Sequence, residues 1–245
     1  DEKDITLKAL EIIRECDIIF MEEYTSKLCG TTREKLERVY NKKIEHLSRE
    51  QVEKMDIILN EARSKKVAFL VPGESMMATT HVSLRLTAEE LNIKTKIIHG
   101  TSIMTAVPSL LGLQHYKFGR ITTIPKFEKN YQPTSPYYVI KENRDRKLHS
   151  LILLDIQTDK NYYMTATEGL KNLRIMEQLE QKNVIHDALL VCIVARAGSD
   201  NPLIKIGEFS SLESMDFGEP LHVIVIPGEL HFEEQRALKV LMFKV

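Results

Sequence analysis

Several classes of protein are excluded by what the sequence lacks. Neither charge sign is in excess, because 34 Lys and Arg residues stand against 35 Asp and Glu residues and the formal net charge is -1. A chain without an overall positive field is not drawn to nucleic acid or to an anionic membrane surface. Long hydrophobic runs are also missing, since the apolar stretches are far shorter than the roughly 18 residues needed to cross a bilayer. With no signal-peptide pattern either, we expect a cytoplasmic protein with no nucleic-acid and no membrane partner.

Cysteine and tryptophan are scarce as well. The three cysteines, Cys16, Cys29 and Cys192, are odd in number and do not have the spacing of a zinc site. Cysteines inside or beside apolar segments are usually reduced core residues, so we expect neither a disulfide nor a metal site. The sequence has no tryptophan, which argues against an aromatic surface for RNA.

Familiar catalytic signatures are absent too. The sequence contains no nucleophile elbow, no Walker loop and no glycine-rich dinucleotide fingerprint. Hydrolases, nucleoside triphosphatases and dinucleotide dehydrogenases therefore have no motif to support them. What is present is a hydrophobic fraction of 43% over 245 residues, enough for the core of one large domain or of two ordinary ones.

The chain is organised around residues 67–81, where a short apolar run breaks at Pro72-Gly73. The run predicts a strand buried on both faces, as in a parallel sheet, followed by a helix from about residue 80. The loop between them then lies at the carboxyl edge of the sheet, where open α/β folds bind ligands. Glu74 in this loop could accept hydrogen bonds from ribose hydroxyls or an ammonium group. The alternative is an ordinary turn in which Glu74 is solvated.

The first half of the chain alternates between strand and helix patterns. Its predicted strands are residues 17–21, 44–47, 67–71 and 94–99. Helix caps are predicted between them, at Asp4, at Thr31 or Thr32, and at Ser48. The helix that Ser48 opens is expected to continue through Leu59. Such alternation implies βαβ units and a mostly parallel sheet.

The pattern changes between residues 112 and 119, and residues 126–136 have no clear periodicity. We therefore predict an α/β fold with two α/β domains, residues 1–112 and residues 113–245. The strands predicted for the second domain are residues 148–156, 188–195, 204–209 and 221–226.

A long helix is predicted within the second domain. Thr165 and Glu168 have the spacing of a capping box at its start. Leu173, Met176 and Leu179 follow on one apolar face. This face exceeds what one core needs, so we expect it to support a homodimer.

Small and polar residues follow several of the predicted strands. These residues are Gly73-Glu74, Thr101-Ser102, Asp155 and Ala197-Gly198. Together they would line a crevice between the two domains and hold a ligand of nucleoside size. Met77, Ile103 and Leu154 would supply apolar contacts to it.

The same segments resemble the motifs of a known enzyme family. They are residues 73–81, 102–103, 143–149, 153–156, 195–199 and 220–222. In this order they are similar to the successive motifs of the diphthine synthase family, over residues 1–231. The resemblance implies a tetrapyrrole-methylase-like, S-adenosylmethionine-dependent methyltransferase with two α/β domains, a cofactor cleft between them, and a homodimeric state.

The resemblance also implies the reaction. The family transfers methyl groups from S-adenosylmethionine to the modified histidine of translation elongation factor 2 during diphthamide biosynthesis, which leaves S-adenosylhomocysteine as product. Carried over residue by residue, the cofactor contacts fall on Glu74, Met77, Ser102, Ile103, Leu154, Ala197 and His222.

Two features depart from the family pattern. The family usually has Gly-Asp-Pro in the central loop, whereas this chain has Gly73-Glu74-Ser75, which keeps the charge but frees the backbone of Ser75. The family's N-terminal Gly-Leu-Gly-Leu loop has no counterpart in this sequence. The change to Gly73-Glu74-Ser75 is the one feature that favours a non-catalytic binding module. A same-fold methyltransferase acting on a tetrapyrrole or on ribosomal RNA is the nearest enzymatic alternative.

Methyl transfer to an amine needs little more than a deprotonated, aligned nitrogen, so positioning can supply most of the catalysis. No general base is evident, and the catalytic residues stay unassigned. His81, His99 and His115 are candidate proton acceptors, although a structural role suits each of them better. Residues 22–26 follow a predicted strand and form either a wall of the substrate pocket or a surface loop.

Overall fold

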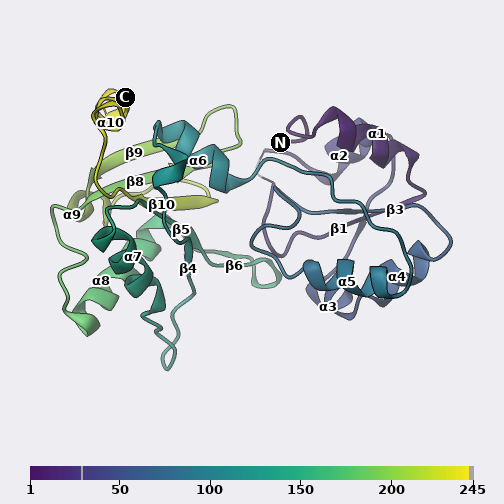
Figure 1. The fold of residues 1–245 in the computed structure, drawn as a ribbon, viewed down its shortest axis with the longest axis horizontal. Coiled ribbons are helices and arrows are strands. Elements are labelled where there is room, and N and C mark those ends of the chain that lie inside the picture. Colours follow the sequence, from purple (N-terminus) through teal and green to yellow (C-terminus); the bar gives the residue numbers. More distant parts are fainter. Residues whose placement is uncertain (29, 243–245) are drawn as a thin grey trace. The chain divides into compact units, whose positions relative to one another are not determined.

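The computed structural model describes residues 1–28 and 30–242. The chain forms two compact units, Asp1–Ile103 and Met104–Val245 (Figure 1). The predicted division at residue 112 falls later than this boundary. The reason is that α6 (Ile103–Leu111) is a continuous helix, and almost all of it belongs to the second unit.

Cys16 and Cys192 are buried as free thiols, and burial raises the pKa of both. Cys29 lies outside the described residues. Within residues 1–28 and 30–242, no three His, Cys, Asp or Glu side chains are grouped to hold a metal ion. The same part of the chain has no helix long and apolar enough to span a bilayer.

The first unit is built on a parallel sheet. Its described strands, in spatial order, are β2 (Glu45–His46), β1 (Ile18–Met21) and β3 (Val67–Leu70). The middle strand β1 buries Ile19, Phe20 and Met21 almost completely, whereas β3 is half-buried along its length. The prediction that residues 67–71 are buried on both faces is therefore wrong, because β3 lies at the edge of the described sheet.

Helices cover both faces of this sheet. Those on one face are α1 (Leu7–Glu15) and α2 (Arg33–Tyr40), and those on the other are α3 (Arg49–Lys54), α4 (Asp56–Ala62) and α5 (Val82–Glu90) (Figure 1). Successive side chains of a strand point to opposite faces. Accordingly, Ile19 packs with Ile13 of α1, and its neighbour Phe20 packs with Ile58 of α4.

Hydroxyl side chains begin three of these helices. Thr32 caps α2, and Ser48 forms the predicted capping box of α3 with Gln51. The cap of α1 is Thr6, not Asp4 as predicted, because the Thr6 hydroxyl accepts a hydrogen bond from the first turn of the helix. Each cap satisfies a backbone N–H that has no partner inside its helix.

Two predicted elements of the first unit differ from the structure. The helix expected from Ser48 through Leu59 is divided into α3 and α4, because Met55 has a left-handed backbone with φ of 62°. Residues 94–99 are not a strand in the described chain. Here the Thr95 N–H donates to the Glu89 carboxylate at 3.2 Å instead of to a strand partner.

The second unit contains a larger sheet. Its described strands, in spatial order, are β4 (Thr122–Ile124), β5 (Ser150–Leu154), β10 (His222–Ile226), β8 (Leu190–Ala195) and β9 (Leu203–Glu208). Of these strands β4 and β5 run parallel, and the remaining neighbours run antiparallel. The parallel arrangement of the first half therefore does not extend to this sheet. Residues 196–202 are too few for a crossover helix, so β9 must return antiparallel to β8.

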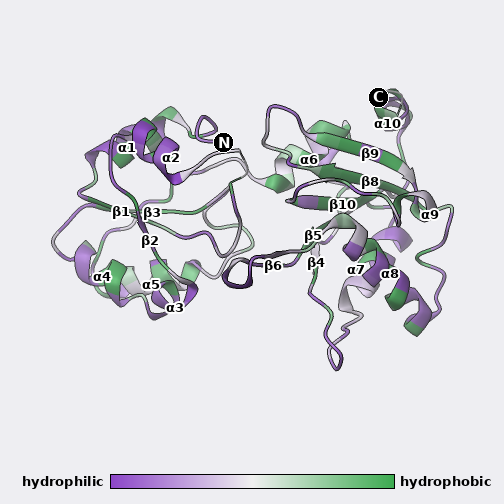
Figure 2. Ribbon diagram, turned by 180° about the vertical axis from the view of Figure 1, so that it is seen from behind, coloured by the Kyte–Doolittle hydropathy of each residue, from purple (hydrophilic) through white to green (hydrophobic). Residues whose placement is uncertain are grey.

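Helices again cover both faces. On one face are α7 (Ser135–Asp145), α8 (Ala166–Glu180) and α9 (Phe209–Leu212), and on the other are α6 and α10 (Phe232–Met242) (Figure 1). The strands β8 and β9 between these layers are predominantly hydrophobic (Figure 2). A short hairpin of β6 (Ile156–Gln157) and β7 (Tyr162–Tyr163) follows β5, and short 3-10 turns occur at His115–Lys117 and Thr158–Lys160.

Helix α8 does not present the apolar face that was expected to support a homodimer. Leu173 and Met176 are fully buried in the core of their own unit, and Leu179 is exposed. The apolar face is therefore used within the chain and does not argue for a dimer. Thr165 caps the helix as predicted. The Glu168 side chain does not complete a capping box, because its carboxylate accepts a hydrogen bond from the Tyr162 hydroxyl instead of from the backbone of Thr165.

Candidate functional site

Glu74 lies in the loop between β3 and α5 and is held by a second segment. Its carboxylate accepts a hydrogen bond from the Gly100 N–H at 3.0 Å, and His99 Nδ1 lies 3.2 Å from the same oxygen. The Glu74 side chain is only 12% exposed, so it is not freely solvated. Each carboxylate oxygen can accept more than one hydrogen bond, which leaves acceptor capacity for a ligand.

Two glycines allow the loop that contains Glu74 and the segment that contains Gly100 to approach each other. Gly73 has φ of 88°, a left-handed conformation that side chains disfavour. A Cβ atom on Gly100 would lie 2.2 Å from the Gly73 carbonyl oxygen, so only glycine fits there. This backbone contact sets the position of the Glu74 carboxylate.

The other predicted residues of the first unit are close by in the chain. Met77 is 47% exposed, and its N–H donates to the Glu74 carbonyl at 3.1 Å. Ser102 and Ile103 are half-buried and follow Gly100, with Ile103 beginning α6. The structure therefore gathers the four predicted residues of this unit into two adjoining segments.

In the second unit, the register of the sheet brings the remaining predicted residues to one edge. His222, which begins β10, pairs with Ala195 at the end of β8, and Ile224 pairs with Ile152 of β5. The carboxyl ends of β5 and β8 therefore flank the start of β10. Leu154 ends β5, and Ala197 follows β8, so both lie at this edge with His222.

Leu154 and Ala197 differ in how accessible they are to a ligand. Leu154 is 7% exposed and belongs to the core, where a Cβ atom on Gly169 would meet its side chain at 2.8 Å. Ala197 is half-buried in a turn that the Ser199 N–H closes by donating to the Arg196 carbonyl at 2.9 Å. The Leu154 side chain thus supports the edge, and Ala197 is the more accessible of the two.

Both ring nitrogens of His222 are engaged inside the second unit. Nδ1 accepts a hydrogen bond from the Ala166 N–H at 3.0 Å, so Nε2 carries the proton and donates to the Glu219 carbonyl at 2.9 Å. Burial lowers the pKa of His222, which favours this neutral form. A ligand contact from His222 would therefore come from its backbone.

Arg196 is a structural residue that sequence reasoning did not single out. Its guanidinium donates to the Phe217 carbonyl at 3.1 Å and also to the Glu219 carbonyl. It therefore fixes the loop before β10, including the carbonyl that holds His222. The one feature of the sequence that could have pointed to Arg196 was its position inside the motif at residues 195–199.

A further polar cluster in the first unit joins the loop after β1 to the end of the loop after β3. His81 is 5% exposed, and its Nε2 lies 3.3 Å from the Tyr24 hydroxyl and 4.0 Å from Glu22. Tyr24 and His81 line a pocket of about 160 Å³. Of the other candidate histidines, His99 is exposed beside Glu74 and His115 is exposed in a 3-10 turn.

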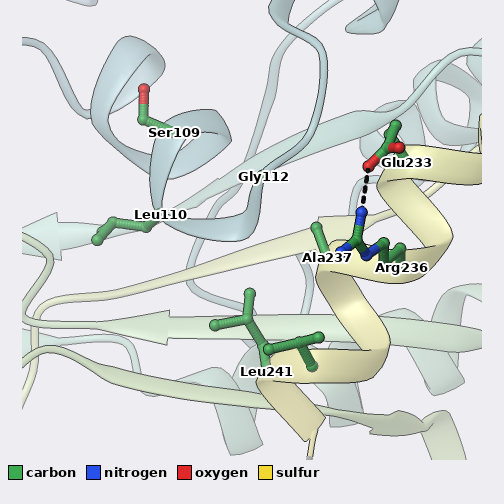
Figure 3. A pocket seen from close by; sticks show the side chains of 8 residues that line it. Ser109, Leu110, Gly112, Glu233, Arg236, Ala237 and Leu241 are labelled. Atoms are coloured by element: carbon green, nitrogen blue, oxygen red, sulfur yellow. Dashed lines mark ion pairs between the residues drawn. The ribbon is translucent and has the colours of Figure 1, made fainter.

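A larger pocket of about 340 Å³ lies between α6 and α10 (Figure 3). Its lining is mainly apolar, and the one ion pair drawn there joins Arg236 to Glu233 at 3.7 Å. None of the predicted cofactor residues is among the described residues that line it. We therefore do not assign the cofactor to this pocket.

The fold and these sites correspond to a known family. Residues 1–213 match the family of Tetrapyrrole (Corrin/Porphyrin) Methylases. Because the match covers most of the chain, the protein belongs to this family and is an enzyme of methyl transfer.

Individual relatives narrow the assignment. The chain is 47% identical to the diphthine synthase of Methanosarcina mazei, over 97% of this chain and 91% of the relative. It is 48% identical to the diphthine synthase of Methanocaldococcus jannaschii, over 98% of this chain and 95% of the relative. A crystal structure of a diphthine synthase superposes with a TM-score of 0.87 at 37% identity, covering 100% of this chain and 96% of the other. Within the methylases, the protein therefore belongs to the diphthine synthases.

Proposed function

We propose that the protein transfers methyl groups from S-adenosylmethionine to the modified histidine of translation elongation factor 2 in diphthamide biosynthesis. The observation that carries this proposal is the identity of 47% with a diphthine synthase over 97% of the chain. Near-neutral charge and the absence of tryptophan give no support to the alternative of an RNA-modifying enzyme of the same fold.

The proposed cofactor contacts are Glu74, Met77, Ser102, Ile103, Leu154, Ala197 and His222. The chemistry of the first unit fits this ligand, because Glu74 offers a fixed carboxylate for hydroxyl groups and Met77 offers an exposed apolar surface beside it. In the second unit, Ala197 and the backbone of His222 would contact the cofactor, and Leu154 would support them.

S-adenosylmethionine, when bound, supplies a methyl group that its sulfonium charge makes reactive. The residues of this chain would bind it and orient its methyl group toward the substrate nitrogen. Alignment of this kind contributes up to about 7–11 kcal/mol in well-oriented systems.

The finer aspects of the function are part of the same proposal. Elongation factor 2 is the protein substrate, the enzyme works in the cytoplasm as a homodimer, and S-adenosylhomocysteine is released. No nucleic acid or membrane takes part. The homodimer rests on the family resemblance alone, since the α8 face that also suggested it is buried.

The test is methylation of elongation factor 2 that already carries the unmethylated modified histidine. After incubation with the protein and S-adenosylmethionine, mass spectrometry should show the mass added by one or more methyl groups on that residue. Unmodified elongation factor 2 is the control. Saturable binding of S-adenosylmethionine in calorimetry without methylation of this substrate would favour another substrate, and no binding would favour a non-catalytic module.

A further inference from the structure

Glu22, Tyr24 and His81 form a linked polar group in the first unit. We propose that this group accepts the proton of the substrate amine: the Tyr24 hydroxyl takes it and passes its own proton to His81, beside the buried carboxylate of Glu22. The inference rests on the proposed function, because it requires an amine substrate that must lose a proton before it is methylated.

The hydrogen bonds of His81 define the direction of the relay. Nδ1 lies 3.3 Å from the Ser75 carbonyl, which can only accept, so Nδ1 carries the ring proton. Nε2 of the neutral ring is then an acceptor for the Tyr24 hydroxyl at 3.3 Å. Phe69 packs against the imidazole edge-on, with ring centroids 5.2 Å apart, and holds it in this orientation.

Glu22 is placed to stabilise a charged His81. Its side chain is fully buried and accepts hydrogen bonds from the Tyr24 N–H at 2.8 Å, the Thr25 N–H at 3.0 Å and the Thr25 hydroxyl. Its Oε1 lies 4.0 Å from His81 Nε2. When His81 accepts the proton, its new positive charge lies beside this carboxylate, and the attraction between opposite charges stabilises the product of the transfer.

Tyr24 is the least buried member of the group, since Glu22 and His81 are both buried. Tyr24 is half-buried and lines the pocket of about 160 Å³, with Thr80 and Ser83 exposed beside it. The substrate amine would approach Tyr24 through this pocket. Burial, with Glu22 next in effect, raises the pKa of Tyr24 to about 12, so its hydroxyl stays protonated at neutral pH and can relay a proton.

Other charged groups also bear on this hydroxyl. Glu53 lines the pocket and, like Glu22, favours the protonated phenol of Tyr24, whereas Arg49 acts in the opposite direction. The two belong to α3 and form an exposed ion pair at 2.7 Å, so they largely offset each other. The buried charge nearest to His81 in the described group is therefore that of Glu22.

The relay is connected to the proposed cofactor loop. Glu74 and Met77 lie in the segment that His81 ends, and Ser75, which holds the His81 ring, lies between them. The loop after β1 and the loop after β3 both follow strands of one parallel sheet, so they meet at its carboxyl edge. This places a proton acceptor next to residues proposed to orient the methyl donor.

The proposed step is balanced without another reactant. An N–H bond of the ammonium group breaks, and its electron pair stays on nitrogen. A new O–H bond forms on Tyr24 while its original O–H bond breaks and an N–H bond forms on His81 Nε2. The products are a neutral amine, which can be methylated, and an imidazolium beside Glu22.

The experiment compares Tyr24→Phe and His81→Gln with the parent over a range of pH, using the modified elongation factor 2. We expect kcat at neutral pH to fall about 10²–10⁴-fold, the usual contribution of acid–base catalysis, with KM changed less than threefold or so. The variant rates should recover as the pH rises, because the amine then deprotonates in solution. Affinity for S-adenosylmethionine, measured by calorimetry, and Tm should stay near those of the parent.

Matched controls are Tyr131→Phe and His231→Gln, which change exposed residues of the second unit. A parent that methylates no elongation factor 2 overturns the proposed function and this inference with it. An active parent whose Tyr24→Phe and His81→Gln variants keep its rate and pH profile overturns the inference alone. Loss of cofactor binding or of several degrees in Tm, without recovery at high pH, shows a purely structural role and also overturns it.

Discussion

At the scale of single residues, Glu74 has the clearest expected effect on ligand binding. Its carboxylate is held by the Gly100 N–H and retains acceptor capacity. We expect Glu74→Ala to weaken S-adenosylmethionine binding roughly tenfold or more, since a hydrogen bond to a charged group is worth about 1.5–3 kcal/mol. Titration calorimetry measures the change. Glu74→Asp should bind about as well as the parent, and the exposed Glu90→Ala should have no effect. An alanine variant within twofold of the parent removes Glu74 from the site.

Glu234 illustrates how a buried charge links stability to pH. It is fully buried on α10. Burial alone would raise its pKa, but the Lys117 ammonium at 2.6 Å and the N–H groups of Gln114 and His231 outweigh it. His149 Nε2 donates to it as well, at 3.0 Å. The net result is a pKa lowered to about 2 from the usual 4.5.

The sign of the pH effect follows from this depressed pKa. The stabilisation by Glu234 is complete above about pH 4.5 and is lost as the pH falls towards about 2. We expect Glu234→Gln to lower the free energy of unfolding by roughly 3 kcal/mol at neutral pH, because the half-buried Lys117 ammonium loses its charged partner. Denaturant unfolding at pH 7 and pH 3 should show the difference shrinking at the lower pH. The exposed Glu233→Gln is the control, and equal effects of the two variants would contradict the argument.

At the scale of elements, the contact between the loop after β3 and the segment at Gly100 can be tested directly. Gly100→Ala would place a Cβ atom 2.2 Å from the Gly73 carbonyl oxygen, so the two segments must separate. We expect this to break the hydrogen bond to Glu74 and to reduce S-adenosylmethionine affinity at least as much as Glu74→Ala. Calorimetry with Thr101→Ala, an exposed neighbour, provides the comparison. Unchanged affinity would mean that the contact does not position the site.

Local chemistry made several elements predictable. The caps at Ser48 and Thr165 were predicted from the sequence, and that of α2 was predicted as Thr31 or Thr32, because a hydroxyl before an apolar periodic segment satisfies a free backbone N–H. Strands β1, β5, β8 and β10 were predicted because runs of apolar residues of that length need burial on both faces. Helix caps and apolar runs both depend on residues that are neighbours in the chain, so they can be recognised from the sequence alone.

Features that depend on distant partners were not predictable in the same way. The helix break at Met55 requires a left-handed backbone, which a methionine side chain does not indicate. Residues 94–99 have the composition of a strand but pair with no strand in the described chain. The same reason applies to the site. Glu74 was found because it follows a strand, whereas the engagement of both His222 nitrogens depends on Ala166 and Glu219, which no spacing rule relates to it.

At the scale of the whole molecule, the open prediction is assembly. We expect a homodimer, and sedimentation at micromolar concentration should give twice the chain mass of 28.2 kDa. A species of 28.2 kDa under these conditions would contradict the prediction.

The position of β10 has a consequence for how the protein is made. This strand is the last of the described strands in the chain, yet it lies between β5 and β8 in the sheet of the second unit. On the ribosome, residues 150–195 emerge well before the strand that joins them, and two apolar edges stay unpaired in the meantime. In the first unit the corresponding wait is shorter, because the free edge of β1 (Ile18–Met21) is paired as soon as β3 (Val67–Leu70) has emerged. The second unit is therefore the part of a nascent chain most exposed to aggregation and most in need of a chaperone.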